Sequence, residues 1–329
     1  NYYTERDNIC LLEFAASLFS PKTLIFLQHL LNRLDIDLYY SIYFLIPFFG
    51  LKCKKVFILH DLIPYLYPEL CTKSRKIKFY TIQKLITGMA VKIADAIIVP
   101  SENTKKDVLS TFSGSAGKIY VIYEGVDLQF KIVQNPDALE MVRKKYGINK
   151  KAVLYIGRQD PSKNLIMLVK AFELVRKEVP CQLVISGKKD ARYPGPYELA
   201  EKSQYKDDII FTGYVQDVDL PVLYQSCDVF AFPSLYEGFG LPPLEAMACG
   251  VPVVTSNVSS LPEVVGDAAL LVDPRNAGEI ANAMKKLLTD DKLRSEMINR
   301  GLNQVKKFSW EKAARETLKV FEEVIGVRA

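Results

Sequence analysis

The sequence predicts an α/β protein with two domains, each built around a parallel sheet. The chain has 329 residues, more than twice the ~150 of a typical domain. From about residue 20, short segments rich in β-branched and aromatic residues alternate with longer stretches of helical periodicity, which is typical of β/α units. With 49% apolar and 25% charged residues, the composition excludes the disordered, collagen-like and disulfide-scaffold classes.

The first domain is expected over residues 1–132. We expect its strands at residues 38–40, 55–59, 96–99 and 119–122, and between them a helix over residues 75–93 with one basic face. The chain opens at Asn1 in a polar stretch without a methionine. We therefore expect an N-terminal segment to be absent and the first domain to be incomplete.

The second domain is expected over residues 133–308, after a polar linker in which Asn135-Pro136 signals a turn. A long helix should begin at Ala277, and a last helix should cover residues 310–325, within a C-terminal unit at 309–329. That helix could close the second domain or cross back to the first. We expect the second-domain strands at residues 152–156, 182–186, 209–212, 229–232, 251–255 and 269–272.

The net charge of +5 is too small to suggest nucleic-acid binding. Basic side chains concentrate between Lys52 and Lys92, and the stretch from Lys73 to Lys84 is either a solvated helix face or a peripheral membrane contact. The longest uncharged apolar run, residues 38–51, is shorter than the ~20 residues that span a bilayer. The six cysteines form no C-x-x-C pair and are expected to be reduced cytosolic thiols. We therefore expect a cytoplasmic protein, with peripheral contact at the inner face of the membrane left open.

The segment FPSLYEGFGLPPLEAMACGVP, residues 232–252, is the most informative window. A strand ends at Phe232, a glycine-rich loop follows, and two prolines mark the start of a helix. Glu237 lies on the loop and Glu245 on the first turns of the helix. Backbone N–H groups at a helix start suit a diphosphate, and carboxylates accept hydrogen bonds from vicinal hydroxyls, so the segment predicts nucleotide-sugar binding.

A second window, VLYIGRQDPSKNLIML at residues 153–168, places Arg158 and Lys163 at a strand-to-helix turn. Ligands of open α/β sheets bind at the carboxyl ends of the strands. Two cations there would neutralise a diphosphate and stabilise it as a leaving group. The simpler alternative is a pair of solvated surface charges.

Two further features have competing interpretations. Asp217-Val218-Asp219 matches a metal-binding D-x-D pattern, but it precedes Leu220-Pro221 as a helix N-cap region would, so we expect no metal. His60 follows the buried strand 56–59 and precedes Asp61, at the carboxyl end where sites lie. A site role for His60 is favoured over a purely structural one, whereas His29 on an apolar helical stretch is expected to be structural.

The motifs G-R-x4-K and E-G-F-G-L-P-x-L-E-A-M-A-C-G, in this order, resemble those of the retaining glycosyltransferases of GT-B fold numbered as family four. The resemblance extends over most of the chain and includes HDLIP at residues 60–64, VPSENTKKD at 99–107 and SSLPEVVGDAALLVDP at 259–274. It implies two Rossmann-like domains whose parallel sheets face a cleft. Where the family commonly has N-G-V-D, this chain has Glu124-Gly125-Val126-Asp127, and the family's opening strand and glycine-rich loop are not found.

The resemblance also implies roles for individual residues. Glu237 would face the donor sugar, Glu245 would hold the ribose, Arg158 and Lys163 would clamp the diphosphate, and His60 would lie near the donor sugar. The remaining donor-binding residues expected are Gly157, Gly187, Val215, Gly238, Phe239, Gly240 and Leu241.

The predicted function is metal-independent transfer of a hexose, with retention, from a GDP- or UDP-linked sugar to a saccharide or lipid-linked acceptor. The N-terminal half resembles mannosyltransferases of surface-polysaccharide assembly, so mannose is the first sugar expected. The alternatives are a nucleotide-sugar epimerase, a phosphorylase or an inactive nucleotide-sugar binder. A glycosidase is disfavoured because paired carboxylates alone would not require the Arg158 and Lys163 cations.

Overall fold

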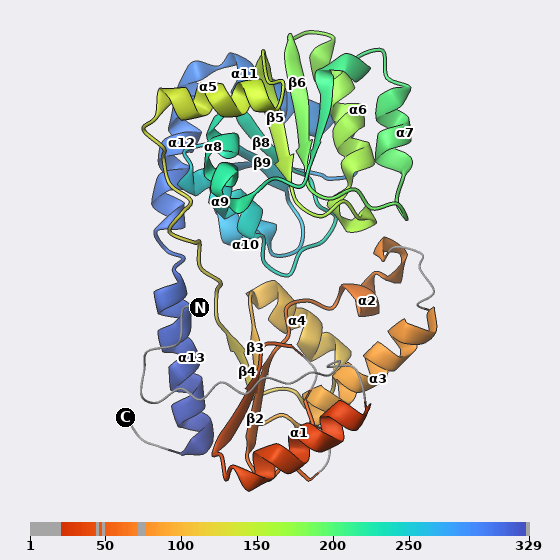
Figure 1. Cartoon of the computed structure of the whole chain (residues 1–329), viewed down its shortest axis with the longest axis vertical. Helices are drawn as coiled ribbons and strands as arrows, with labels where there is room; N and C mark the ends of the chain where they lie inside the picture. Colours follow the sequence, from red (N-terminus) through yellow and green to blue (C-terminus); the bar gives the residue numbers. More distant parts are fainter. Residues whose placement is uncertain (1–20, 44–45, 48–49, 72–76, 327–329) are drawn as a thin grey trace.

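Two parallel sheets organise the chain, one in each domain (Figure 1). A computed structural model describes residues 21–43, 46–47, 50–71 and 77–326. Lys73, Arg75 and Lys76 of the predicted basic face lie outside these residues. Within them, the strands lie where the alternating pattern placed them, to within one or two residues at each end.

The first sheet has the order β1-β2-β3-β4, with every pair parallel. Strand β3 (Ala96–Val99) is buried on both faces of the sheet, which explains why its sequence is an uninterrupted apolar run. The elements of this domain are α1 (Pro21–Arg33), β1 (Leu38–Ser41), β2 (Lys54–Ile58), α2 (Ile63–Leu66), α3 (Ile77–Ile93), β3 (Ala96–Val99), α4 (Glu102–Thr111) and β4 (Ile119–Val121).

The second sheet has the order β10-β9-β8-β5-β6-β7 and is parallel throughout. Its strands are β5 (Lys151–Ile156), β6 (Cys181–Ser186), β7 (Ile209–Gly213), β8 (Val229–Phe232), β9 (Val253–Ser256) and β10 (Ala269–Val272). Its helices are α5 (Pro136–Lys145), α6 (Leu165–Arg176), α7 (Gly195–Glu201), α8 (Leu220–Gln225), α9 (Leu241–Ala248), α10 (Leu261–Val265), α11 (Ala277–Thr289) and α12 (Asp291–Val305).

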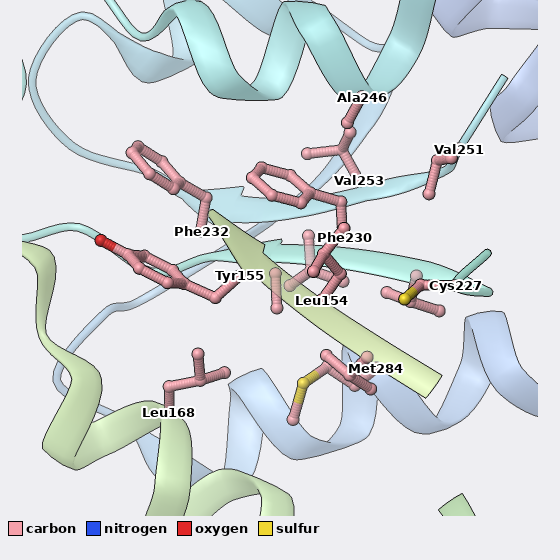
Figure 2. Close-up of a cluster of buried hydrophobic side chains, with 14 of the residues drawn as sticks. Leu154, Tyr155, Leu168, Cys227, Phe230, Phe232, Ala246, Val251, Val253 and Met284 are labelled. Atoms are coloured by element: carbon pink, nitrogen blue, oxygen red, sulfur yellow. The ribbon is translucent and has the colours of Figure 1, made fainter. Parts of the chain in front are cut away.

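The core of the second domain lies on both faces of this sheet. Figure 2 shows Leu168 and Met284 on one side of the central strands and Ala246 on the other. Tyr155 and Phe232, on adjacent strands, stack with ring centroids 5.8 Å apart. This packing fixes the carboxyl ends of β5 and β8, from which the loops discussed below emerge.

The long helix expected from Ala277 is two helices. Asp290 has an extended backbone, and its side chain accepts a hydrogen bond from the Leu293 N–H, capping α12. The helix breaks here because the Asp290 side chain caps the first turn of α12, which favours starting a new helix over continuing α11.

Helix α13 (Trp310–Ile325) crosses back to the first domain, where Figure 1 shows it beside the first sheet. Ala313 and Val320 join a buried cluster with side chains of β2, β3 and the end of β4. Tyr40 packs edge-on against Phe321 at 4.9 Å between ring centroids. The Tyr120 hydroxyl donates to Glu323, and burial, reinforced by this carboxylate, raises the pKa of Tyr120 to about 12.

Gly125 is the point where α13 begins its contact with the first domain. A Cβ atom at Gly125 would overlap the backbone of Ser309 and Trp310. The glycine of the E-G-V-D motif is therefore required for the close approach of two backbones.

We predict that Gly125→Ala lowers the free energy of unfolding by roughly 1 to 3 kcal/mol, because the helix start must move away from the sheet. Gly88→Ala, within α3, is the control: its Cβ would lie 3.5 Å from Phe112, an ordinary contact, and alanine favours a helix. Urea unfolding measures both variants, and equal stability of the two would contradict the proposed close approach.

Candidate active site

A cavity of about 560 Å³ opens at the carboxyl ends of β5, β6 and β7. From β5 the chain continues to β6 and β7 on one side of β5, and it then crosses to β8 on the other side. The strand order therefore reverses at β5, and ligands of such sheets bind at this kind of switch point. Of the predicted residues, Gly157, Arg158, Gly187 and Val215 line this cavity.

Two glycines at the cavity allow the loops after β5 and β6 to touch. Gly157 has φ +152° and Gly187 has φ +136°, both in the region that favours glycine. A Cβ on Gly187 would overlap the Gly157 carbonyl oxygen. The predicted glycines thus provide the close packing that forms the cavity floor.

Several cavity residues were missed by the sequence analysis. Lys188, Lys189 and Arg192 follow β6 and add positive charge, while Gln159 donates to the Gly187 carbonyl at 3.0 Å. A Gly-Lys-Lys segment directly after a predicted strand was the available signal. Asp190 pairs with Arg192 at 2.6 Å, which lowers the pKa of Asp190 to about 2.

Lys163 and Glu237 form an ion pair, and neither is among the described residues that line the cavity. The Lys163 Nζ lies 2.7 Å from Glu237 Oε1 and 2.8 Å from Oε2. Both side chains are largely buried, at 15% and 12% exposed. The strand-to-helix turn after β5 is a 3₁₀ segment (Pro161–Lys163) followed by Asn164 in the left-handed region, and α6 starts at Leu165.

Arg158 differs from Lys163 in its surroundings. Its side chain is 80% exposed and lies 3.4 Å from Asp160. It lines the 560 Å³ cavity and also a second one of about 240 Å³ that includes Asp61 of the first domain. Arg158 therefore lies where a ligand between the domains would meet it.

The loop that carries Glu237 is held by both domains. The Gly238 carbonyl accepts hydrogen bonds from Ser101 at 2.7 Å and Thr104 at 3.1 Å, both of the first domain. A Cβ on Gly238 would overlap the His60 carbonyl oxygen. This brings His60 and Glu237 to the same interface.

Helix α4 of the first domain is capped by the second domain. The Glu263 carboxylate accepts from the backbone N–H groups of Glu102 at 2.8 Å and Asn103 at 3.2 Å. The Tyr236 hydroxyl donates to Asp107. These contacts hold the two domains at the predicted cleft.

Glu245 lies on α9 and is mostly buried. The Tyr224 hydroxyl donates to its Oε2 at 2.7 Å. Burial raises the pKa of Glu245, although the Tyr224 hydrogen bond opposes the shift. A ligand hydroxyl that donated to Glu245 would supply a further hydrogen bond to the charged form.

The other predicted loop residues contribute backbone or packing. Phe239 is buried against Tyr123 and Phe308. Gly240 has φ +123° and precedes Leu241, the first residue of α9. None of these three is among the described residues that line the 560 Å³ cavity.

Asp217 and Asp219 lie in a short 3₁₀ segment before α8. Asp219 pairs with Lys145 at 2.6 Å, and the Tyr214 hydroxyl lies 3.4 Å from Asp217. Asp217 therefore lines the cavity, whereas the Asp219 side chain contacts α5.

Both halves of the chain match known protein families. Residues 140–304 match the family described as "Glycosyl transferases group 1", and residues 5–130 match "Glycosyltransferase Family 4". The chain belongs to the group 1 glycosyltransferases. It is a transferase of GT-B fold, as its motifs predicted.

Two relatives of this glycosyltransferase come from Escherichia coli. O-antigen chain mannosyltransferase B is 35% identical over 272 residues, which cover 82% of this chain and 70% of that protein. Serotype-specific mannosyltransferase WbdA is 31% identical over 285 residues, which cover 85% of this chain but only 35% of that protein.

Solved structures share the two-domain architecture. Sucrose-phosphate synthase of Thermosynechococcus elongatus superimposes with a TM-score of 0.78 at 25% identity, covering 94% of this chain and 78% of that one. HepE of Anabaena in complex with UDP-glucose gives a TM-score of 0.77 at 20% identity, covering 94% of this chain and 84% of that one.

Within the described residues, no helix has the length and apolar character needed to cross a membrane.

We predict unequal stability effects for substitutions at Lys163 and Arg158. Lys163→Ala should lower the free energy of unfolding by on the order of 3 kcal/mol, because it leaves the Glu237 carboxylate buried without its cation. Arg158→Ala should change it by less than about 0.5 kcal/mol, because the side chain is exposed.

Chemical denaturation measures both changes, and the double variant Lys163→Ala/Glu237→Ala is the control. Removing both partners leaves no unpaired charge, so the double variant should recover much of the lost stability. If the two single variants are equally stable, the difference in burial has no energetic consequence and the prediction is wrong.

Proposed function

We propose that this glycosyltransferase transfers mannose, with retention, from GDP-mannose to a hydroxyl of a growing polysaccharide chain. The observation that carries the proposal is the largely buried Lys163–Glu237 pair, which joins the loops after β5 and β8, together with the cavity that Arg158 lines at the carboxyl end of β5. The choice of mannose rests on the mannosyltransferases among its relatives, one of them named for the O-antigen chain.

The site residues have separate roles in the proposed reaction. Arg158 and Lys163 stabilise the negative charge that develops on the departing diphosphate. Glu237, fixed by Lys163 and by the backbone contacts of its loop, accepts hydrogen bonds from hydroxyls of the transferred sugar. Glu245 does the same for the ribose. The departing phosphate assists deprotonation of the acceptor, so the proposal needs no protein nucleophile.

Fixed cations replace a metal in this proposal. Lys188, Lys189 and Arg192 line the cavity in addition to Arg158, so a diphosphate meets positive charge without a bound ion. The basic residues near Lys84 would allow peripheral membrane contact if the acceptor is lipid-linked.

The transfer assay uses radiolabelled GDP-mannose, UDP-glucose and UDP-N-acetylglucosamine with mannan oligosaccharides as acceptors. We expect mannosyl transfer from GDP-mannose, α-anomeric product, and activity within about two-fold of the control after EDTA, because protein cations supply the charge. Loss of activity that Mn²⁺ restores would reassign Asp217 to a metal site. Acceptor-independent turnover would favour the epimerase, phosphate-dependent turnover the phosphorylase, and binding alone the inactive binder.

The two carboxylates should separate sugar from nucleotide recognition. Glu237→Gln is expected to reduce kcat by at least ~10-fold while leaving the Kd for GDP nearly unchanged, because GDP lacks the sugar that Glu237 contacts. Glu245→Gln should weaken binding of both GDP and GDP-mannose. Calorimetry and steady-state kinetics measure these effects, and equal loss of GDP affinity in both variants would refute the assignment.

A further inference from the structure

Both ring nitrogens of His60 face oxygen atoms that can only accept. Nδ1 lies 3.3 Å from Glu124 Oε1, and Nε2 lies 3.2 Å from the carbonyl oxygen of Ile42. A neutral imidazole carries one N–H and would leave one of these contacts between two acceptors. The doubly protonated imidazolium is the form that satisfies both contacts.

The Glu124 carboxylate lies where it can stabilise the doubly protonated form of His60. It follows β4, and its side chain is 19% exposed, against 46% for His60. The hydrogen bond from the ring to Glu124 is the largest cause of a raised His60 pKa, and burial opposes it. Asp61 and the Ile42 carbonyl add to the increase.

Other charges near the ring do not replace Glu124. Two cavities of the structure include His60 in their linings. Among the described residues that line them, Glu124 and Asp61 are the charged ones besides His60. On the loop packed against His60, Glu237 is already paired with Lys163.

We infer that Glu124 is a positioning residue that holds His60 as a doubly protonated cation on the first-domain side of the cleft. His60 then contributes positive charge beside the Glu237 loop and has no lone pair with which to act as a general base. The inference rests on the proposed function for its catalytic consequence, but the protonation state is a property of the free protein.

The chain contains only two histidines, His29 and His60, so imidazole NMR signals are readily assigned with a His60→Asn variant. In wild-type protein the His60 resonance should titrate above its ordinary pKa of 6.5. In Glu124→Gln the midpoint should fall by about one pH unit or more, because a hydrogen-bond acceptor remains but the charge is lost. The surface control Glu140→Gln should leave the His60 midpoint at its wild-type value.

An unchanged His60 midpoint in Glu124→Gln would overturn the inference. If that variant does not fold, ¹⁵N shifts of the wild-type ring at pH 7 decide the matter: two protonated nitrogens support the inference, and one unprotonated nitrogen overturns it. Neither measurement uses substrate, so both stand even if no sugar nucleotide is turned over.

Rate–pH profiles with GDP-mannose test the catalytic consequence. Wild-type kcat should persist to higher pH than that of Glu124→Gln, with up to ~10-fold separation on the alkaline side for a one-unit difference in midpoint. Glu124→Asp, which restores the charge, should move the profile back toward wild type. Superimposed profiles would show that the His60 charge has no part in transfer.

Discussion

The absence of a side chain at Gly238 is the constraint on which the interdomain site depends. Its carbonyl accepts hydrogen bonds from the hydroxyls of Ser101, the N-cap of α4, and Thr104, and a Cβ at this position would overlap the His60 carbonyl oxygen. A larger residue would separate the loop from the first domain. Because Glu237 is the preceding residue, the same contact sets where its carboxylate stands relative to Lys163 and His60.

Charge at the site is arranged by pairing rather than by isolated groups. Lys163 with Glu237, Arg192 with Asp190 and His60 with Glu124 each place opposite charges within hydrogen-bonding range or close to it. Paired charges can be held partly out of water at lower cost than single ones. Lys188 and Lys189 add positive charge to the cavity beyond these pairs, in keeping with an anionic ligand.

The E-G-V-D segment connects the C-terminal helix to this site. Its glycine admits the backbone of Ser309 and Trp310, where α13 begins to cross back. Its glutamate reaches the His60 ring. One short loop segment after β4 thus joins the C-terminal helix to the first domain and sets the hydrogen bonding of His60 at the cleft.

Local sequence was sufficient for the strands, most helices and the family, because buried parallel strands are continuous apolar runs and the motifs retain fixed spacing around strand ends. It also identified Arg158, Lys163, Glu237 and Glu245 as candidates. Tertiary structure alone decided where α13 packs and that Lys163 and Glu237, 74 residues apart, form a pair. It likewise joined Glu124 to His60. These contacts join residues distant in the chain, and their geometry is fixed by sheet order and domain packing, which no local pattern encodes.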